Sequence, residues 1–309
     1  MAKGLTGRNF ISVLDFSSDE ITSVLETARQ LKEGGEPFGT EPLHGKTLAM
    51  IFQKPSLRTR VSFETGMTRL GGHAIYLAPT DISLNQRETT EDIGLVLSRY
   101  VDVIMARVFG HDIVVDLARH ATVPVINGLS DLEHPCQILA DFQTIIERKG
   151  ALKGLNACFI GDGNNVAHSL MLGAARMGMN MTILCPSGYE PNDEVTQRAV
   201  ELGKETDSSI RVTSDRSVVN GADVLYTDVW ASMGQESEVA KRRKVFERFR
   251  IDAAIMKMAD PDAVILHCLP AHYGDEIDYE TSRLPNSAIF DQAENRMHAQ
   301  NALLLLLAR

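Results

Sequence analysis

Two stretches of the sequence, LHGKTLAMIF at residues 43–52 and LKGLNACFIGD at residues 152–162, follow one pattern. Each begins with Leu-x-Gly, continues through a short spacer, and enters an apolar run that has the length of a buried strand. The second copy therefore predicts the first strand of a second domain. A length of 309 residues agrees with this interpretation, because domains of about 150 residues are typical.

Strands and helices alternate around the first stretch. Pro135 predicts the start of one helix and Gly150 its end, because proline is tolerated at the first helical position and glycine favours a helix end. The strands predicted in this half are 47–52, 73–78, 102–108 and 123–127, and the helices are 18–31, 58–70, 89–100, 112–121 and 135–149.

The second half continues the alternation. After the strand in residues 152–162, the predicted strands are 181–185, 210–214, 224–230 and 263–269, and the predicted helices are 165–177, 193–205 and 237–249. Alternating buried strands and helices favour parallel sheets that are covered on both faces. The predicted fold class is α/β, with two doubly wound Rossmann-like parallel-sheet domains.

The overall charge restricts the possible partners. A formal net charge of −10 argues against nucleic acid and against an anionic membrane, since both require a broad cationic face. The start MAKGLTGRNF lacks an apolar signal region, and the longest aliphatic run, residues 303–307, is far shorter than the roughly 20 residues that span a bilayer. We therefore expect a cytoplasmic protein.

The cysteines indicate neither a zinc cage nor a disulfide framework, because Cys136, Cys158, Cys185 and Cys268 form no CxxC pair. The pair His267 and Cys268 could suggest a metal site or a nucleophilic thiol. Neighbouring strand residues point to opposite faces of a sheet, however, and this disfavours both interpretations. No metal is predicted.

Polar residues follow the predicted strands, at the sheet edge where ligands bind in such folds. In QKPSLRTR (53–60) a strand leads into a helix, whose N-terminal N–H groups can bind phosphate. Ser56 and Thr59 add hydroxyl donors, and the Arg58 guanidinium can make charge-assisted or bidentate bonds to phosphate oxygens. The alternative is a capped surface helix with solvated arginines. Arg107 at the end of a buried strand favours function, since an unpaired interior guanidinium is costly.

The stretch GDGNN (161–165) allows a second interpretation, a dinucleotide-binding turn. The GxGxxG pattern would need glycine at position 166, where the sequence has Val166. Hydride transfer with a nicotinamide cofactor is therefore disfavoured.

Several separated motifs occur together in the sequence: SLRTR (56–60), HPCQ (134–137), DVWASMG (228–234), HCLP (267–270) and FDQAENRMHAQNALL (290–304). In this order they resemble the transcarbamoylases, and among these the ornithine carbamoyltransferases, from about residue 8 to the end of the chain. The resemblance implies two Rossmann-like domains, a homotrimer or a multiple of trimers, and active sites at subunit boundaries. It also implies a carbamoyl-phosphate-binding domain, 1–148, completed by the C-terminal helix 293–309, and an ornithine-binding domain, 149–292.

The implied reaction transfers the carbamoyl group of carbamoyl phosphate to the δ-amine of L-ornithine, giving L-citrulline and phosphate in arginine metabolism. No metal or organic cofactor is implied. By resemblance, the phosphate would be bound by Ser56, Leu57, Arg58, Thr59 and Arg107. Donors to the carbamoyl oxygen would be Thr59, Arg107, His134 and Arg296, and acceptors for its NH2 group would be Gln137 and the backbone carbonyls of Cys268 and Leu269.

The resemblance assigns the amino-acid substrate to the second domain. Asn165 would bind its α-carboxylate, and Asp228 with Ser232 and the Met233 backbone would bind its α-ammonium group. Asp228 and Cys268 would also lie near the δ-amine. The catalytic residues implied are Arg107, His134, Gln137, Asp228, Cys268 and Arg296.

Two positions depart from the family pattern. Leu57 replaces a threonine, and Ser83 stands where a longer side chain usually reaches the phosphate site of a neighbouring subunit; Gln86 or Arg87 could substitute for it. Two alternative functions stay open. The protein could be a carbamoyltransferase for another amine, such as putrescine, lysine or an acylated ornithine, or a non-catalytic paralogue that binds the same ligands.

Overall fold

The computed structural model describes residues 4–36, 38–84, 87–231 and 236–309. Internal contacts divide the chain into two compact units. The first comprises Met1–Gln143 with Glu294–Arg309, and the second comprises Thr144–Ala293. Both boundaries fall inside helices, α6 (Pro135–Lys149) and α11 (Ile289–Ala308), whereas the sequence placed the first boundary at a helix end.

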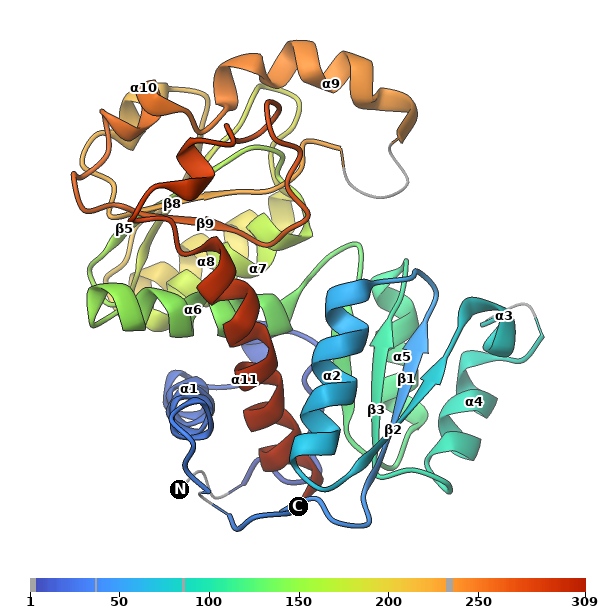
Figure 1. The fold of residues 1–309 in the computed structure, drawn as a ribbon. Helices are drawn as coiled ribbons and strands as arrows, with labels where there is room; N and C mark the ends of the chain where they lie inside the picture. Colours follow the sequence, from blue (N-terminus) through green and yellow to red (C-terminus); the bar gives the residue numbers. More distant parts are fainter. Residues whose placement is uncertain (1–3, 37, 85–86, 232–235) are drawn as a thin grey trace. The chain divides into compact units, whose positions relative to one another are not determined.

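The first unit is built on a four-stranded parallel sheet with the strand order β2-β1-β3-β4 (Figure 1). Its strands are β1 (Thr47–Phe52), β2 (His73–Leu77), β3 (Val103–Arg107) and β4 (Val125–Leu129). Its helices, besides parts of α6 and α11, are η1 (Val13–Asp15), α1 (Ser18–Lys32), α2 (Leu57–Arg69), α3 (Pro79–Ile82), α4 (Thr90–Leu97) and α5 (His111–His120).

Helices cover both faces of this sheet. Ala49 and Ile51 of β1 pack in one hydrophobic cluster with Ile93 of α4 and Leu117 of α5. On the opposite face Phe52 contacts Tyr76 of β2, and the Arg60 guanidinium of α2 lies 3.9 Å from the Tyr76 ring centroid. The period of two along the strands places successive apolar residues on these two covered faces.

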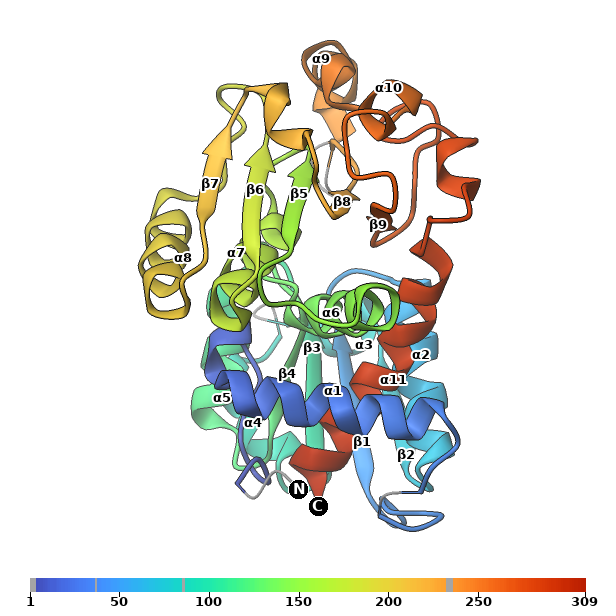
Figure 2. The same ribbon diagram turned by 90° about the vertical axis from the view of Figure 1, so that its left-hand side faces the viewer.

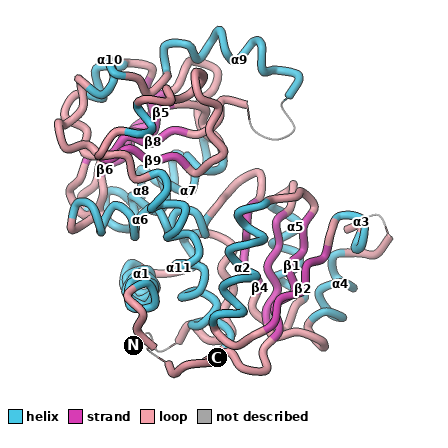
Figure 3. The backbone as a smooth tube through the Cα atoms, in the orientation of Figure 1, coloured by secondary structure: helices cyan, strands magenta, loops and turns pink. Residues whose placement is uncertain are grey.

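The second unit contains a five-stranded parallel sheet with the order β7-β6-β5-β8-β9; Figure 3 shows the strands of both sheets in magenta. The strands are β5 (Asn156–Ile160), β6 (Asn180–Leu184), β7 (Ile210–Thr213), β8 (Val224–Thr227) and β9 (Val264–His267). Besides parts of α6 and α11, the helices are α7 (Asn165–Met177), α8 (Asp193–Thr206), η2 (Arg216–Val219), η3 (Glu236–Glu238), α9 (Val239–Phe246), η4 (Glu247–Phe249), α10 (Ala253–Met256) and η5 (Thr281–Arg283).

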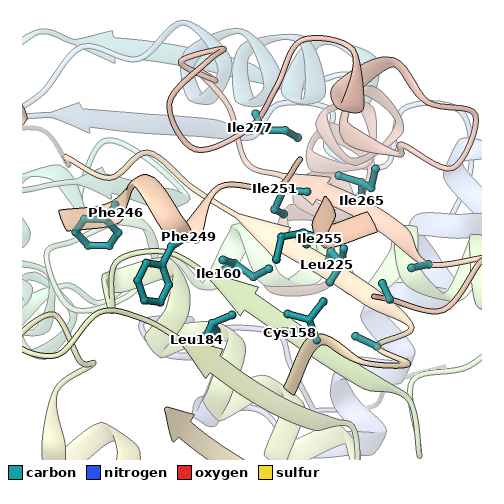
Figure 4. Packing of buried hydrophobic residues seen from close by; sticks show 14 of the residues in the cluster. Cys158, Ile160, Leu184, Leu225, Phe246, Phe249, Ile251, Ile255, Ile265 and Ile277 are labelled. Carbon is teal, nitrogen blue, oxygen red and sulfur yellow. The ribbon is translucent and has the colours of Figure 1, made fainter. Parts of the chain in front are cut away.

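Helices α7 and α8 pack against β6 and β7 (Figure 2). Elsewhere in this unit, Ile160 and Leu225 pack against Phe246, Phe249 and Ile255 from the segments after β8 (Figure 4). Both sheets are thus parallel and covered by helices, and the predicted doubly wound α/β class is confirmed.

Three predicted elements extend too far by two or more residues at one end, and the strand predicted at 123–127 lies two residues too early, because β4 is Val125–Leu129. The strands predicted at 224–230 and 263–269 end at Thr227 and His267. Asp228 and Leu269 explain these ends, because the Asp228 carboxylate accepts the Val229 N–H at 2.8 Å and Leu269 has a φ of 59°, in the left-handed region. The helix predicted at 89–100 is also too long, since α4 ends at Leu97. The helix predicted at 237–249 is confirmed: α9 continues on both sides into the 3-10 turns η3 and η4, so all of these residues are helical.

None of the helices in the described part of the chain combines the length and the apolar character needed to cross a lipid bilayer. All four cysteines are free, and Cys268 is the only one of them that is not buried. Burial raises the pKa of the Cys136, Cys158 and Cys185 thiols to about 12, so these three are protonated near neutral pH.

Candidate active site

The N-terminus of α2 lies directly after β1 in the first unit. Ser56 is the N-cap residue, and its hydroxyl accepts the Thr59 N–H at 3.4 Å and donates to the Thr59 hydroxyl at 3.1 Å. The buried Thr59 side chain is therefore fixed at the sheet edge where ligands bind in this fold class.

Arg58 stands in the first turn of this helix and is half-buried. In the part of the chain that the structure describes, its guanidinium makes no hydrogen bond or ion pair, so its donors are available to an anion. Leu57 is 75% exposed, and only its backbone N–H can contribute to anion binding at the helix start.

Arg107 is the last residue of β3 and is 6% exposed. Ala106 pairs with Asn127 and Arg107 with Leu129, so Gly128 is an extra residue of β4 that breaks the ladder beside the guanidinium. A Cβ at Gly128 would lie 2.5 Å from Met105 Sδ, so a larger residue here would displace the buried Met105 side chain.

Arg296 of α11 connects three sequence motifs within the first unit. Its Nη1 donates to Gln137 Oε1 at 2.6 Å, and its Nη2 donates to Thr59 Oγ1 at 3.3 Å. The Gln137 amide is oriented by Asp141 of α6, which accepts from Gln137 Nε2 at 2.8 Å. Asp141 was not predicted; its position one helical turn after Gln137 was the available signal.

His134 immediately precedes α6 and is buried. Burial, followed by the nearby charges of Arg296 and Arg107, lowers its pKa well below 6.5. The imidazole is therefore neutral near pH 7 and can donate one N–H.

We predict that His134 makes folding stability depend on pH. Below pH 6.5 the unfolded chain protonates this ring and the folded chain does not, so stability falls as the pH falls through 6.5. Between pH 7.5 and 5.5 the wild type should lose about 1 kcal/mol more unfolding free energy than His134→Gln, as measured by urea denaturation. Parallel curves would contradict this, and His44→Gln, at an exposed histidine, is the control.

Asp228 follows β8 in the second unit and is buried. Asn164 Nδ2 donates to Asp228 Oδ2 at 2.7 Å, and Cys268 Sγ donates to Oδ1 at 3.0 Å. With the Val229 N–H, the carboxylate has three donors that fix its plane. The structure thus brings together Asp228 and Cys268, which are 40 positions apart.

Asn165 is the first residue of α7 and is half-buried, at the edge predicted for it. Its neighbour Asn164 was missed by the sequence analysis. The Asn164 side chain caps α7 by accepting from Val166 N and Ala167 N, and it also holds Asp228. An asparagine directly before a predicted helix was the signal that could have found it.

The prediction that the side chains of His267 and Cys268 point apart is wrong. Donor atoms of Asp228, His267 and Cys268 all lie within 4.8 Å of one another, because β9 ends at His267 and strand alternation no longer applies to Cys268. Both ring nitrogens of His267 are already engaged: Nε2 pairs with Glu276 at 3.0 Å and Nδ1 accepts the Leu269 N–H at 2.9 Å. A metal would have to displace one of these bonds.

Asp162, between Gly161 and Gly163, forms an ion pair with Arg242 at 2.9 Å. Burial raises the pKa of Asp162 to about 6 and outweighs the opposing effect of Arg242. Arg242 also donates to the Trp230 carbonyl at 2.8 Å, so it connects the GDGNN turn to the segment that follows β8. Ser232, Met233 and Gln86 lie outside the described residues.

We predict that Gly163→Ala lowers the unfolding free energy by about 1–3 kcal/mol, through overpacking. A Cβ at this position would lie 2.2 Å from Pro191 N and 2.4 Å from the Glu190 carbonyl carbon, so backbone must move. Denaturant titration measures the effect. Gly94→Ala is the control because its Cβ would be 3.4 Å from the nearest atom, and an equal loss in both variants would contradict the explanation.

Fold and site together define a two-unit α/β protein with a cation-lined edge in one unit and a buried carboxylate in the other. Two family models match the chain: "Aspartate/ornithine carbamoyltransferase, carbamoyl-P binding domain" over residues 8–147 and "Aspartate/ornithine carbamoyltransferase, Asp/Orn binding domain" over residues 153–307. The chain belongs to the aspartate/ornithine carbamoyltransferase family, which confirms the resemblance seen in the sequence.

Individual members of the family are similar to this chain over nearly its whole length. The anabolic ornithine carbamoyltransferase of Pyrococcus furiosus is 51% identical over 311 residues, which cover 99% of this chain and 98% of that protein. The solved structure of the Pyrococcus furiosus enzyme superposes with a TM-score of 0.95 over 99% of each chain. The ornithine carbamoyltransferase structure from Thermus thermophilus, 41% identical, gives a TM-score of 0.87 over 97% of this chain and 99% of that chain.

Proposed function

We propose that this protein is an ornithine carbamoyltransferase: it transfers the carbamoyl group of carbamoyl phosphate to the δ-amine of L-ornithine, giving L-citrulline and phosphate. The observation that carries the proposal is the contact of Arg296 with both Thr59 and Gln137, which brings three separated motifs into one group of donors and acceptors. The relatives of about 50% identity named ornithine carbamoyltransferase support the choice of substrate.

In the first unit, the proposed phosphate site is the α2 N-terminus with Arg58 and Arg107. The helix start supplies N–H groups and a partial positive charge, and the two guanidinium groups supply charge-assisted bonds. The residues proposed for this site are Ser56, Leu57, Arg58, Thr59 and Arg107.

Four donors of the first unit are proposed to stabilise the carbamoyl oxygen: Thr59, Arg107, His134 and Arg296. Attack by an amine builds negative charge on this oxygen, and fixed buried donors stabilise it without reorganising. Gln137 Oε1 accepts one bond from Arg296 and keeps a second lone pair for the carbamoyl NH2 group. The backbone carbonyls of Cys268 and Leu269 are proposed to accept from that same NH2 group.

In the second unit, Asn165 is proposed to bind the α-carboxylate of ornithine, and Asp228, Ser232 and the Met233 backbone its α-ammonium group. Asp228 and Cys268 are also proposed to contact the δ-amine. This amine must be neutral to attack, whereas a free alkylamine with a pKa near 10.4 is mostly protonated at pH 7. The fixed Asp228 carboxylate can attract the substrate nitrogen and help it lose its proton.

The bond changes follow from these positions. The nitrogen lone pair attacks the carbamoyl carbon, the carbon–oxygen bond to phosphate then breaks, and phosphate leaves with the bonding electrons. The nitrogen loses one proton, which the departing phosphate can accept, and becomes part of a ureido group. The cationic groups at the α2 N-terminus stabilise the departing phosphate.

An assay with carbamoyl phosphate and a panel of amines tests the proposal. The panel contains L-ornithine, putrescine, L-lysine and N-acetyl-L-ornithine, and the readout is the ureido product. We expect product with L-ornithine at a kcat/KM far above that for the other amines. A preference for another amine would identify a related carbamoyltransferase, and no product with any amine would identify a non-catalytic paralogue.

We further propose a biosynthetic role in the cytoplasm and assembly as homotrimers or multiples of trimers. The name of the Pyrococcus furiosus relative supports the biosynthetic direction, and four free cysteines support a reducing compartment. Sedimentation equilibrium tests the assembly: a mass of three 34.0 kDa chains, or a multiple of it, is expected, and a monomer would contradict the proposal.

A further inference from the structure

Arg296 is a buried arginine whose planar guanidinium has donors on three sides. Two sides donate to Gln137 and Thr59, as described above. The third side, the Nε–H, faces Gln300, which lies one helical turn later on α11 and is fully buried.

One orientation of the Gln300 amide pairs donors with acceptors. In it, Oε1 accepts from Arg296 Nε at 3.2 Å, and Nε2 donates to Ser62 Oγ at 2.5 Å and to the Arg296 carbonyl at 3.2 Å. Ser62 in turn donates to the Thr59 carbonyl at 3.2 Å. Because Arg296 Nη2 donates to the Thr59 hydroxyl, these four residues form a closed ring of hydrogen bonds between α2 and α11.

We infer that Gln300 is a positioning residue for Arg296. The bond to Nε fixes the rotation of the guanidinium plane, and the bond to Ser62 ties that plane to the first turns of α2, where Thr59 lies. Nothing in this ring requires Gln300 to touch a ligand. The inference rests on the proposed function, because it gives Arg296 the task of orienting carbamoyl phosphate.

A purely structural role for Gln300 would give a different result when Gln300 is replaced. If Gln300 only satisfied a polar position between two helices, its loss would reduce stability without depending on which cation stands at position 296. If it acts through Arg296, its effect must depend on the Nε–H, which a lysine lacks. A double-mutant cycle separates these two cases.

The experiment measures the Kd of phosphonoacetamide, a stable analogue of carbamoyl phosphate, by calorimetry. The four proteins are the wild type, Gln300→Met, Arg296→Lys and the double variant. We expect Gln300→Met to weaken binding about tenfold in the wild-type background, as for loss of a hydrogen bond to a charged group, and less than twofold in the Arg296→Lys background. Binding by calorimetry needs no turnover, so a failed amine assay leaves this test intact.

Two further variants serve as controls, because they distinguish a specific loss of binding from a loss caused by misfolding. Asn301→Leu changes a neighbouring buried residue of α11 whose side chain lies against Gly66 of α2, and it should leave the Kd within twofold. Ser62→Ala breaks the ring from a half-buried position and should weaken binding about threefold. Equal losses from Gln300→Met in both backgrounds, or no loss in either, would overturn the inference, as would a wild type that binds no phosphonoacetamide.

Discussion

Arg107→Met is expected to lower kcat/KM for carbamoyl phosphate by about 10³-fold in a folded protein. The guanidinium is proposed to contact both the phosphate and the carbamoyl oxygen, so its loss removes ground-state binding and part of the oxyanion stabilisation. One such donor contributes about 3–4 kcal/mol to catalysis. Methionine keeps most of the length and apolar volume of the side chain, so the end of β3 should remain packed.

Steady-state kinetics with varied carbamoyl phosphate and varied ornithine checks this prediction. The KM for carbamoyl phosphate should rise and kcat should fall, with a smaller change in the KM for ornithine. Arg119→Met is the matched control, because the Arg119 side chain is 68% exposed and forms a surface ion pair with Asp116. A fall in kcat/KM of less than tenfold in folded Arg107→Met would contradict the role given to Arg107.

Asp228→Asn is expected to lower kcat/KM for ornithine by about 10³-fold. The carboxylate accepts from Asn164, Val229 and Cys268, and an asparagine would turn an NH2 group toward at least one of these donors. The substitution also removes the negative charge proposed to attract the substrate nitrogen. Each hydrogen bond to a charged group contributes about 1.5–3 kcal/mol, and at least two are weakened.

Asp223→Asn provides the control at the opposite end of the same strand. Asp223 stands just before β8, and its Oδ2 accepts the Asn156 N–H at 2.8 Å. This variant should lose at most about 1 kcal/mol of stability and keep its kcat/KM within twofold. If the two aspartate variants showed equal kinetic losses, the Asp228 network would have no special part in the reaction.

Local sequence signals were sufficient to predict the central elements of both sheets. The strand 47–52 and the helix 165–177 were predicted with the bounds that the structure has, because a continuous apolar run and a capped amphipathic run define them. Pro135 likewise marked the start of α6. The two-unit α/β architecture follows from such signals repeated along the chain.

The edges of the site depend on contacts that are distant in sequence and could not be predicted in this way. Apolar residues continue past Thr227 and His267, yet both strands stop because side-chain bonds and a left-handed Leu269 replace the ladder. Asn165 was selected by resemblance; the local capping signal of Asn164 could have marked a helix start, but not its bond to Asp228, which lies 64 positions away. No local sequence pattern marked Arg296 as a site residue. Only its hydrogen bonds to Thr59 and Gln137 in the folded protein connect it to the other motifs.

The most direct test of the account is a crystal structure of the protein with N-(phosphonoacetyl)-L-ornithine, a molecule that joins both proposed substrates. We expect its phosphonate at the α2 N-terminus with Arg58 and Arg107, its carbonyl oxygen beside His134 and Arg296, and its amino-acid end beside Asn165 and Asp228. A phosphonate bound away from residues 56–59 and Arg107, or an amino-acid end away from Asp228, would contradict the account.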